Sequence, residues 1–148
     1  MTIGRFDQNL KAKYHTPELG IGPWGERIGE DILKSMDFDC FKKQGKTLQG
    51  QPFDRLCRRS ERWYIVEIKA AQHGFVGTPS HTQKRRMREV LEEVKEVEPV
   101  LLQINLGASK YKIRYGREVR LLITDSERKR LELDNIINWV KVTIAKQQ

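Results

Sequence analysis

Glu67 and Lys69 are the residues whose types and spacing most readily suggest chemistry. They lie in the run Arg62–Ala70, whose aromatic and β-branched residues predict a strand. This run is apolar enough to be buried on both faces of a sheet, where a carboxylate or an ammonium group needs a partner or a metal ion. Side chains two residues apart on a strand point to the same face, so the two groups would share one site.

Asp54 lies in the preceding predicted strand, Gln51–Arg58. If Ser60 and Glu61 form the tip of a hairpin, Asp54 stands opposite Glu67, about 5 Å away. Two poorly solvated carboxylates at that distance favour a cation between them, and Mg²⁺ or Mn²⁺ suits oxygen ligands. The predicted turn lacks the Asn-Gly or Asp-Gly signal that usually accompanies such a hairpin. The Glu-x-Lys pattern also occurs at Glu93–Lys95 and Glu127–Lys129, and its alternative interpretation is an edge strand with surface charges.

The order of Asp54 and then Glu67, Ile68 and Lys69 resembles the signature of the PD-(D/E)XK nuclease superfamily, with archaeal Holliday-junction resolvases as the closest type. Pro52 is displaced by one residue from the Pro-Asp dipeptide of the family. The resemblance implies that Asp54, Glu67 and the backbone carbonyl of Ile68 hold one Mg²⁺, for which Mn²⁺ could substitute. It also implies that Lys69 positions or deprotonates the attacking water.

A helix is predicted over Pro23–Met36, because its apolar residues recur at helical spacing. The run beginning at Gly25 is similar to the first helix of resolvase-like members. On that spacing Glu26 matches the family's helix acid and would bind the metal directly or through water. Glu30, one turn further on the same side, is the alternative. Acidic residues early in a helix also occur simply because they complement its dipole.

A second helix is predicted to begin near Ser80, which forms a capping box with Gln83, and to run to about Val97. Gln83 resembles the family's fourth motif and would approach the scissile phosphate or its water, unless it only caps the helix. Basic residues in and before this helix are predicted to contact nucleic acid rather than only solvent. These residues are Lys84, Arg85, Arg86, Arg88, Lys46, Arg58 and Arg59.

Composition places the chain among globular proteins with a polyanionic partner. It has 148 residues, 32% of them charged and 38% hydrophobic, which predicts one globular domain. Residues 1–22 are polar and show no clear period, so they are predicted to form an N-terminal arm that precedes the domain (23–148). The formal net charge of +8 points to nucleic acid, with an anionic membrane surface a distant second. No apolar run approaches the roughly 20 residues needed to span a bilayer. Cys40 and Cys57 are expected to be buried, reduced thiols of a cytoplasmic protein.

The predicted order of helices and strands indicates an α/β fold. After the second helix come a strand (Val100–Leu106), a hairpin (Tyr111–Tyr115 and Val119–Thr124) and a closing amphipathic helix from Leu131 to Ile144. The stripe of that helix is expected to be core, with a dimer face as the alternative. The resemblance, which covers about Gly25 to Asn105, implies a restriction-endonuclease-like core, a mixed central β-sheet flanked by helices.

These observations predict a Mg²⁺-dependent DNA endonuclease of low sequence specificity or directed by DNA structure. Holliday-junction resolution, DNA repair, recombination and restriction are the candidate settings. A resolvase would be a homodimer, because a four-way junction is cut symmetrically. The alternatives are a catalytically inactive nucleic-acid-binding module of the same fold, an RNA-processing nuclease, and a basic scaffold protein.

Overall fold

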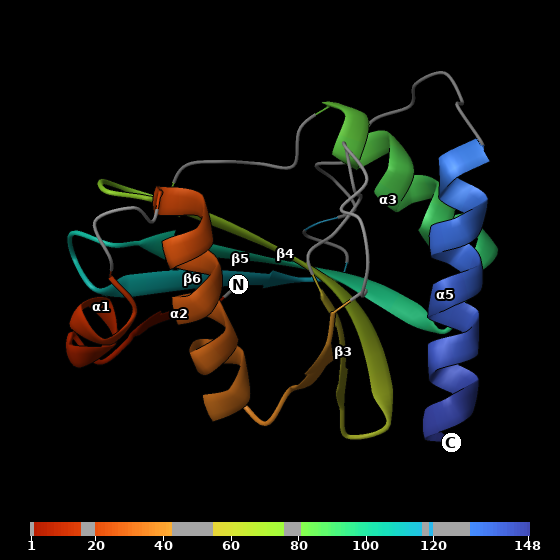
Figure 1. The fold of residues 1–148 in the computed structure, drawn as a ribbon, viewed down its shortest axis with the longest axis horizontal. Helices are drawn as coiled ribbons and strands as arrows, with labels where there is room; N and C mark the ends of the chain where they lie inside the picture. The colour runs from red at the N-terminus through yellow and green to blue at the C-terminus, as the bar shows by residue number, and fades with distance from the viewer. Residues whose placement is uncertain (1, 16–19, 43–54, 76–80, 117–118, 120–130) are drawn as a thin grey trace.

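The computed structural model describes residues 2–15, 20–42, 55–75, 81–116, 119 and 131–148, with the backbone alone for residues 81–86 and 131–135. These segments form a six-stranded mixed sheet with helices on both sides (Figure 1). The strands are β1 (Thr2–Arg5), β2 (Asp39–Phe41), β3 (Arg55–Arg59), β4 (Arg62–Ala71), β5 (Val97–Asn105) and β6 (Lys110–Tyr115). The helices are α1 (Asn9–Tyr14), α2 (Ile21–Ser35), α3 (His81–Glu93) and α5 (Leu131–Gln147).

The strand order is β1-β6-β5-β4-β3-β2. Strands β4 and β5 are parallel, and every other neighbouring pair is antiparallel. A parallel pair needs a long crossover connection, and α3 lies on the connection between β4 and β5. The predicted α/β fold with a mixed sheet is confirmed.

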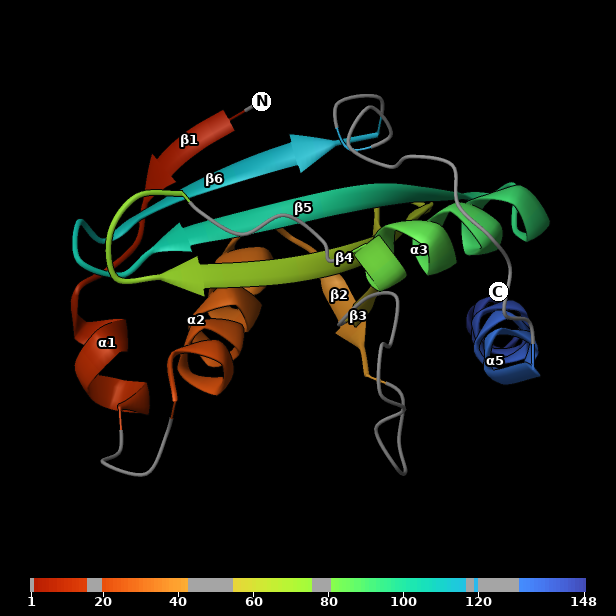
Figure 2. The same cartoon turned by 90° about the horizontal axis from the view of Figure 1, so that it is seen from above.

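The helices form two groups, α1 with α2 and α3 with α5, at opposite ends of the sheet (Figure 2). Each group of helices also packs on its own hydrophobic cluster. There are two clusters because successive side chains of β4 point to opposite faces of the sheet. Val66 and Ile68 of β4 pack in the cluster with α2, whereas Ile65 packs in the cluster with α3 and α5. The closing helix predicted from Leu131 is confirmed as α5. The described part of its apolar stripe packs in the core: Ile136, Ile137, Val140 and Ile144.

The hairpin between β3 and β4 has the predicted tip and register. Ser60 and Glu61 form its two-residue turn with φ of 50° and 66°, which is the left-handed pattern of a type I′ turn. Arg55 pairs with Val66 at the far end of the recorded ladder. The register is thus fixed by a turn whose residue types are unusual for its geometry.

The N-terminal segment contains regular structure where the sequence predicts an aperiodic arm. Strand β1 extends the sheet by pairing with β6, and Phe6 is buried in the cluster with α2. The partner of β1 lies far along the chain, so local periodicity carries no signal of the pairing. Strand β6 likewise pairs with β5 and β1. Of its predicted partner, Val119–Thr124, only Val119 lies within the described residues, and its backbone is helical rather than extended.

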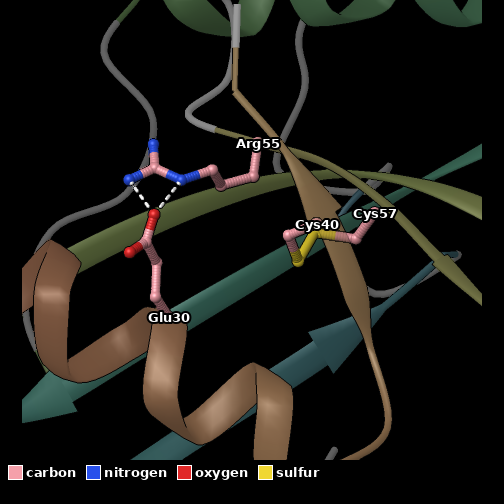
Figure 3. The surroundings of a disulfide bond; sticks show 4 residues. All are labelled: Glu30, Cys40, Arg55 and Cys57. Carbon is pink, nitrogen blue, oxygen red and sulfur yellow. Dashed lines mark hydrogen bonds and ion pairs between the residues drawn. A yellow bond between two sulfur atoms is a disulfide. The ribbon is translucent and has the colours of Figure 1, made fainter. Parts of the chain in front are cut away.

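The prediction of reduced cysteines is wrong. Cys40 of β2 and Cys57 of β3 are direct partners in the antiparallel register and form a disulfide bond (Figure 3). Two cysteines opposite each other on neighbouring strands lie close enough to be bridged. The sequence does not reveal this arrangement, because it shows two cysteines 17 residues apart without the pairing of their strands.

Candidate active site on strand β4

Glu67 and Lys69 occupy an interior strand, which rules out the alternative of an edge strand with surface charges. The Glu67 side chain is 3% exposed and that of Lys69 is 27% exposed. Lys69 Nζ lies 3.7 Å from Glu67 Oε1, so the two groups form an ion pair on one face. The burial of Glu67 and the shared face of the two groups agree with the prediction, whereas Lys69 is less buried than the sequence predicts.

The other residues predicted around Glu67 are described only in part. The recorded β3–β4 ladder ends at Arg55 and Val66, and the next residues along the two strands are Asp54 and Glu67. Asp54 and Lys46 lie outside the described residues. Helix α3 begins at His81 and includes four of the predicted site residues, whose side chains are outside the described part. Those four residues are Gln83, Lys84, Arg85 and Arg86.

The two acids of α2 contact an arginine that sequence reasoning missed. Arg55 Nη2 and Nε each lie 2.6 Å from Glu30 Oε1, and Arg55 Nη1 lies 3.4 Å from Glu26 Oε1. Figure 3 shows Arg55 reaching from β3 towards Glu30 on α2. Arg55 is 4% exposed, so the pairs anchor an almost fully buried charge. The signal was available, because the reasoning that a buried charge needs a partner applies to Arg55 as it does to Glu67.

The α2 acids approach the sheet from the face opposite to that of Glu67 and Lys69. Arg55 and Val66 are partners and share one face, and strand alternation turns Glu67 to the other. Glu26 and Glu30 lie on the same side of α2, as predicted. Glu26 is engaged by Arg55, so a metal ion that used Glu26 would have to compete with that arginine.

Three of the predicted nucleic-acid-binding residues are described, and all three make contacts within the protein. Arg58 pairs with Asp39 at 3.5 Å, and Arg88 pairs with Glu92 at 3.1 Å. Arg59 is surrounded by aromatic rings, whose centroids lie 4.1–5.9 Å from its Cζ. The rings belong to Phe38, Tyr64 and Tyr115. Contact of these arginines with nucleic acid stays a prediction.

Gln103 is a second residue that the sequence did not reveal. It lies on β5 directly beside Lys69 in the parallel register. The side chain is buried, at 3% exposed, and its Nε2 donates a hydrogen bond of 3.2 Å to the carbonyl oxygen of Phe75. The residue types around Gln103 form an ordinary apolar strand, so only the register brings it to the site.

The oxygen atoms at Glu67 and Ile68 are of the type that binds hard cations. Carboxylate and backbone carbonyl oxygens are the ligands that Mg²⁺ and Mn²⁺ prefer, and Glu67 with the carbonyl of Ile68 would supply them. Within the described segments, no three histidine, cysteine or acidic side chains gather closely enough to hold a metal ion. A complete metal site of the predicted kind therefore depends on Asp54.

Comparison with known proteins gives no family assignment. No family model matches the sequence, and no curated protein matches it significantly. Among the helices in the described part of the chain, none has the length and hydropathy required to span a membrane.

Proposed function

We propose that this protein is a metal-dependent DNA endonuclease that hydrolyses phosphodiester bonds. The observation that carries the proposal is the buried Glu67, which is ion-paired with Lys69 on the interior strand β4. Glu67 follows Val66, the register partner of Arg55, and Asp54 is the residue that precedes Arg55 in sequence. A carboxylate is rarely buried without a strong reason, and a divalent cation at a phosphate is one. The order of helix, three antiparallel strands, helix and parallel strand also accords with the resemblance to PD-(D/E)XK nucleases.

In this proposal Asp54, Glu67 and the Ile68 carbonyl would hold Mg²⁺. When bound, the cation would lower the pKa of a coordinated water and offset charge on the phosphate. Lys69 would orient the attacking water by donating a hydrogen bond from its ammonium group or, in its neutral amine form, would accept a proton from that water at Nζ. Arg55 would hold Glu26 and Glu30 in place on the other side of the strand, so that the backbone next to Asp54 is fixed.

DNA is the proposed partner because the chain is strongly basic, with a formal net charge of +8. We infer low sequence specificity or recognition of branched DNA, and a homodimer if four-way junctions are the substrate. The cytoplasm usually keeps cysteine thiols reduced, so the Cys40–Cys57 disulfide does not favour a cytoplasmic location for this protein.

The test is a cleavage panel with Mg²⁺ or Mn²⁺ on labelled duplex, single-stranded, nicked, flapped and four-way-junction DNA. Lys69→Met should lower the cleavage rate by about 10²–10⁴-fold, the usual range for loss of a proton-transfer group. Glu67→Gln removes a charged ligand of the cation and should lower the rate at least as much. The chain offers a matched control in Glu93 and Lys95, which have the same spacing and are both exposed. Glu93→Gln and Lys95→Met should cut at the normal rate.

Two outcomes would contradict the proposal. Cutting that survives in Glu67→Gln would assign the activity to another site. Binding without cutting on all five substrates would instead favour the inactive nucleic-acid-binding module. A parallel competition with RNA of equal length decides between DNA and RNA as the substrate.

A further inference from the structure

A row of polar and charged side chains crosses three strands beside the Glu67–Lys69 pair. Lys69 of β4 is the register partner of Gln103 on β5, and Gln103 is the partner of Lys112 on β6. Directly opposed residues on neighbouring strands present their side chains to the same face. Lys69, Gln103 and Lys112 therefore form one line across the sheet, on the face that carries Glu67.

The chain covers part of this row with an aromatic ring. After β4 ends, the Phe75 carbonyl accepts a hydrogen bond from Gln103, and Lys112 Nζ lies 5.5 Å from the centroid of the Phe75 ring. Gln103 is buried, whereas Lys69, Phe75 and Lys112 are only half-buried. Gln103 thus acts as a positioning residue for Phe75, and the ring and both ammonium groups keep access to solvent.

The next row of the sheet adds a further cation. Glu67 is the partner of Leu101, and Leu101 is the partner of Arg114. The Arg114 Nε atom is buried and makes no hydrogen bond within the part of the chain that the structure describes. Arg114 as a whole is half-buried, so its guanidinium group adds a positive charge to this face at which an anion could be held.

We propose that Lys112, Phe75 and Arg114 form a nucleotide-binding subsite next to Lys69, which holds the DNA strand beside the bond to be cut. A phosphate would bind to Lys112 and Arg114, and the apolar side of the same nucleotide would pack on the Phe75 ring. Aromatic rings interleaved with cations are how proteins hold nucleic-acid strands without reading their sequence. The proposed function supplies only the identity of the ligand, since the geometry of the row is independent of catalysis.

The test measures binding without metal, so that it is separate from cleavage. Labelled single-stranded and duplex DNA is titrated in chelator at several salt concentrations. Lys112→Ala should reduce the slope of log K against log[salt] by about one, because one phosphate contact is lost. Lys146→Ala, at an exposed position on α5, removes the same charge and should change the slope much less. Phe75→Leu should weaken binding about fivefold or more at unchanged slope, and Phe75→Tyr should retain it.

The outcomes separate this inference from the proposed function. Equal effects of Lys112→Ala and Lys146→Ala, or normal binding by Phe75→Leu, would overturn the subsite even if the protein cuts DNA. Binding that depends on Lys112 and Phe75 in a protein that never cuts would leave the subsite standing and remove the nuclease. RNA that binds more tightly than DNA, and whose binding is weakened to the same extent by Lys112→Ala and Phe75→Leu, would overturn DNA as the ligand.

Discussion

The two faces of strand β4 hold their charged groups in different ways. On the α2 face, Arg55 is buried and pairs with the carboxylates of Glu26 and Glu30. The Cys40–Cys57 disulfide joins the edge strand β2 to its neighbour β3. On the opposite face, Glu67 and Lys69 are 3.7 Å apart and the ammonium group keeps contact with solvent. The first face is held by covalent and ionic links, whereas the second leaves the Lys69 ammonium group partly exposed to solvent.

This difference shows that one strand can make stabilising contacts on one face and carry partly exposed charged groups on the other. Strand alternation places successive residues on separate faces, so the residues that pack against the helix do not compete for space with the residues proposed to meet a substrate. Val66 and Ile68 pack under α2, while Glu67 between them points the other way. We expect substitutions on the α2 face to change stability first and those on the other face to change binding or cleavage first.

The largest expected effect on the α2 face comes from the disulfide. Its reduction should lower the free energy of unfolding by about 3 kcal/mol, because the bond closes a loop with a sequence separation of 17 residues. Urea titrations with and without reductant measure this change. The double variant Cys40→Ser, Cys57→Ser is the control and should not respond to reductant. Equal stability in the two conditions for the natural sequence would show that the bond contributes nothing to the rigidity of this face.

Loss of the buried arginine should have the next largest effect. Arg55→Met should lower the free energy of unfolding by about 2 kcal/mol. This is less than the usual cost of breaking a fully buried pair, because the side chains of Glu26 and Glu30 are 30% and 47% exposed and can be hydrated. Arg58→Met is the control: its pair with Asp39 joins side chains that are 34% and 63% exposed, and it also lies over the Trp63 ring, so the change should stay within about 1 kcal/mol. Similar losses in the free energy of unfolding for Arg55→Met and Arg58→Met would show that the burial of Arg55 does not make its ion pairs more important for stability.

The smallest expected effect tests how closely α2 packs on β4. A Cβ added at Gly25 would collide with the Cβ of Ala70, whereas one added at Gly22 would meet nothing within 4 Å. Gly25→Ala should therefore lower the free energy of unfolding by about 1–2 kcal/mol through overpacking. Gly22→Ala should leave it unchanged or raise it by up to about 1 kcal/mol, through higher helix propensity. Thermal unfolding of the two variants measures the difference, and a neutral Gly25→Ala would mean that α2 can shift freely on the strand.

Local pattern was enough to predict the strand with its charges, the hairpin and the main helices. The apolar run around Glu67 and Lys69 predicts an interior strand because burial, alternation and β-propensity agree there. The tip at Ser60 and Glu61 follows from the lengths of two strands. The α2 acids fall on one side, as helical spacing requires.

What the sequence did not reveal depends on pairings between distant segments. Gln103 reaches the site only because β5 is parallel to β4, and Cys40 meets Cys57 only through one register of β2 and β3. Arg55 finds its partners across the interface between a strand and a helix. Strand register and helix docking fix these contacts, and neither leaves a periodic trace in the chain.

The pairing of β1 with β6 has a consequence for how the protein is made. Thr2 lies beside Ile113, so β1 is joined to β6, which is synthesised later than the other described strands of the sheet. During translation β1 has no neighbour until β5 and β6 have emerged, and contacts between such distant segments form slowly. We expect the amides of Thr2–Arg5 to be the last in the sheet to gain protection in pulsed hydrogen-exchange refolding. Until then the nascent chain displays an open strand that a chaperone could occupy.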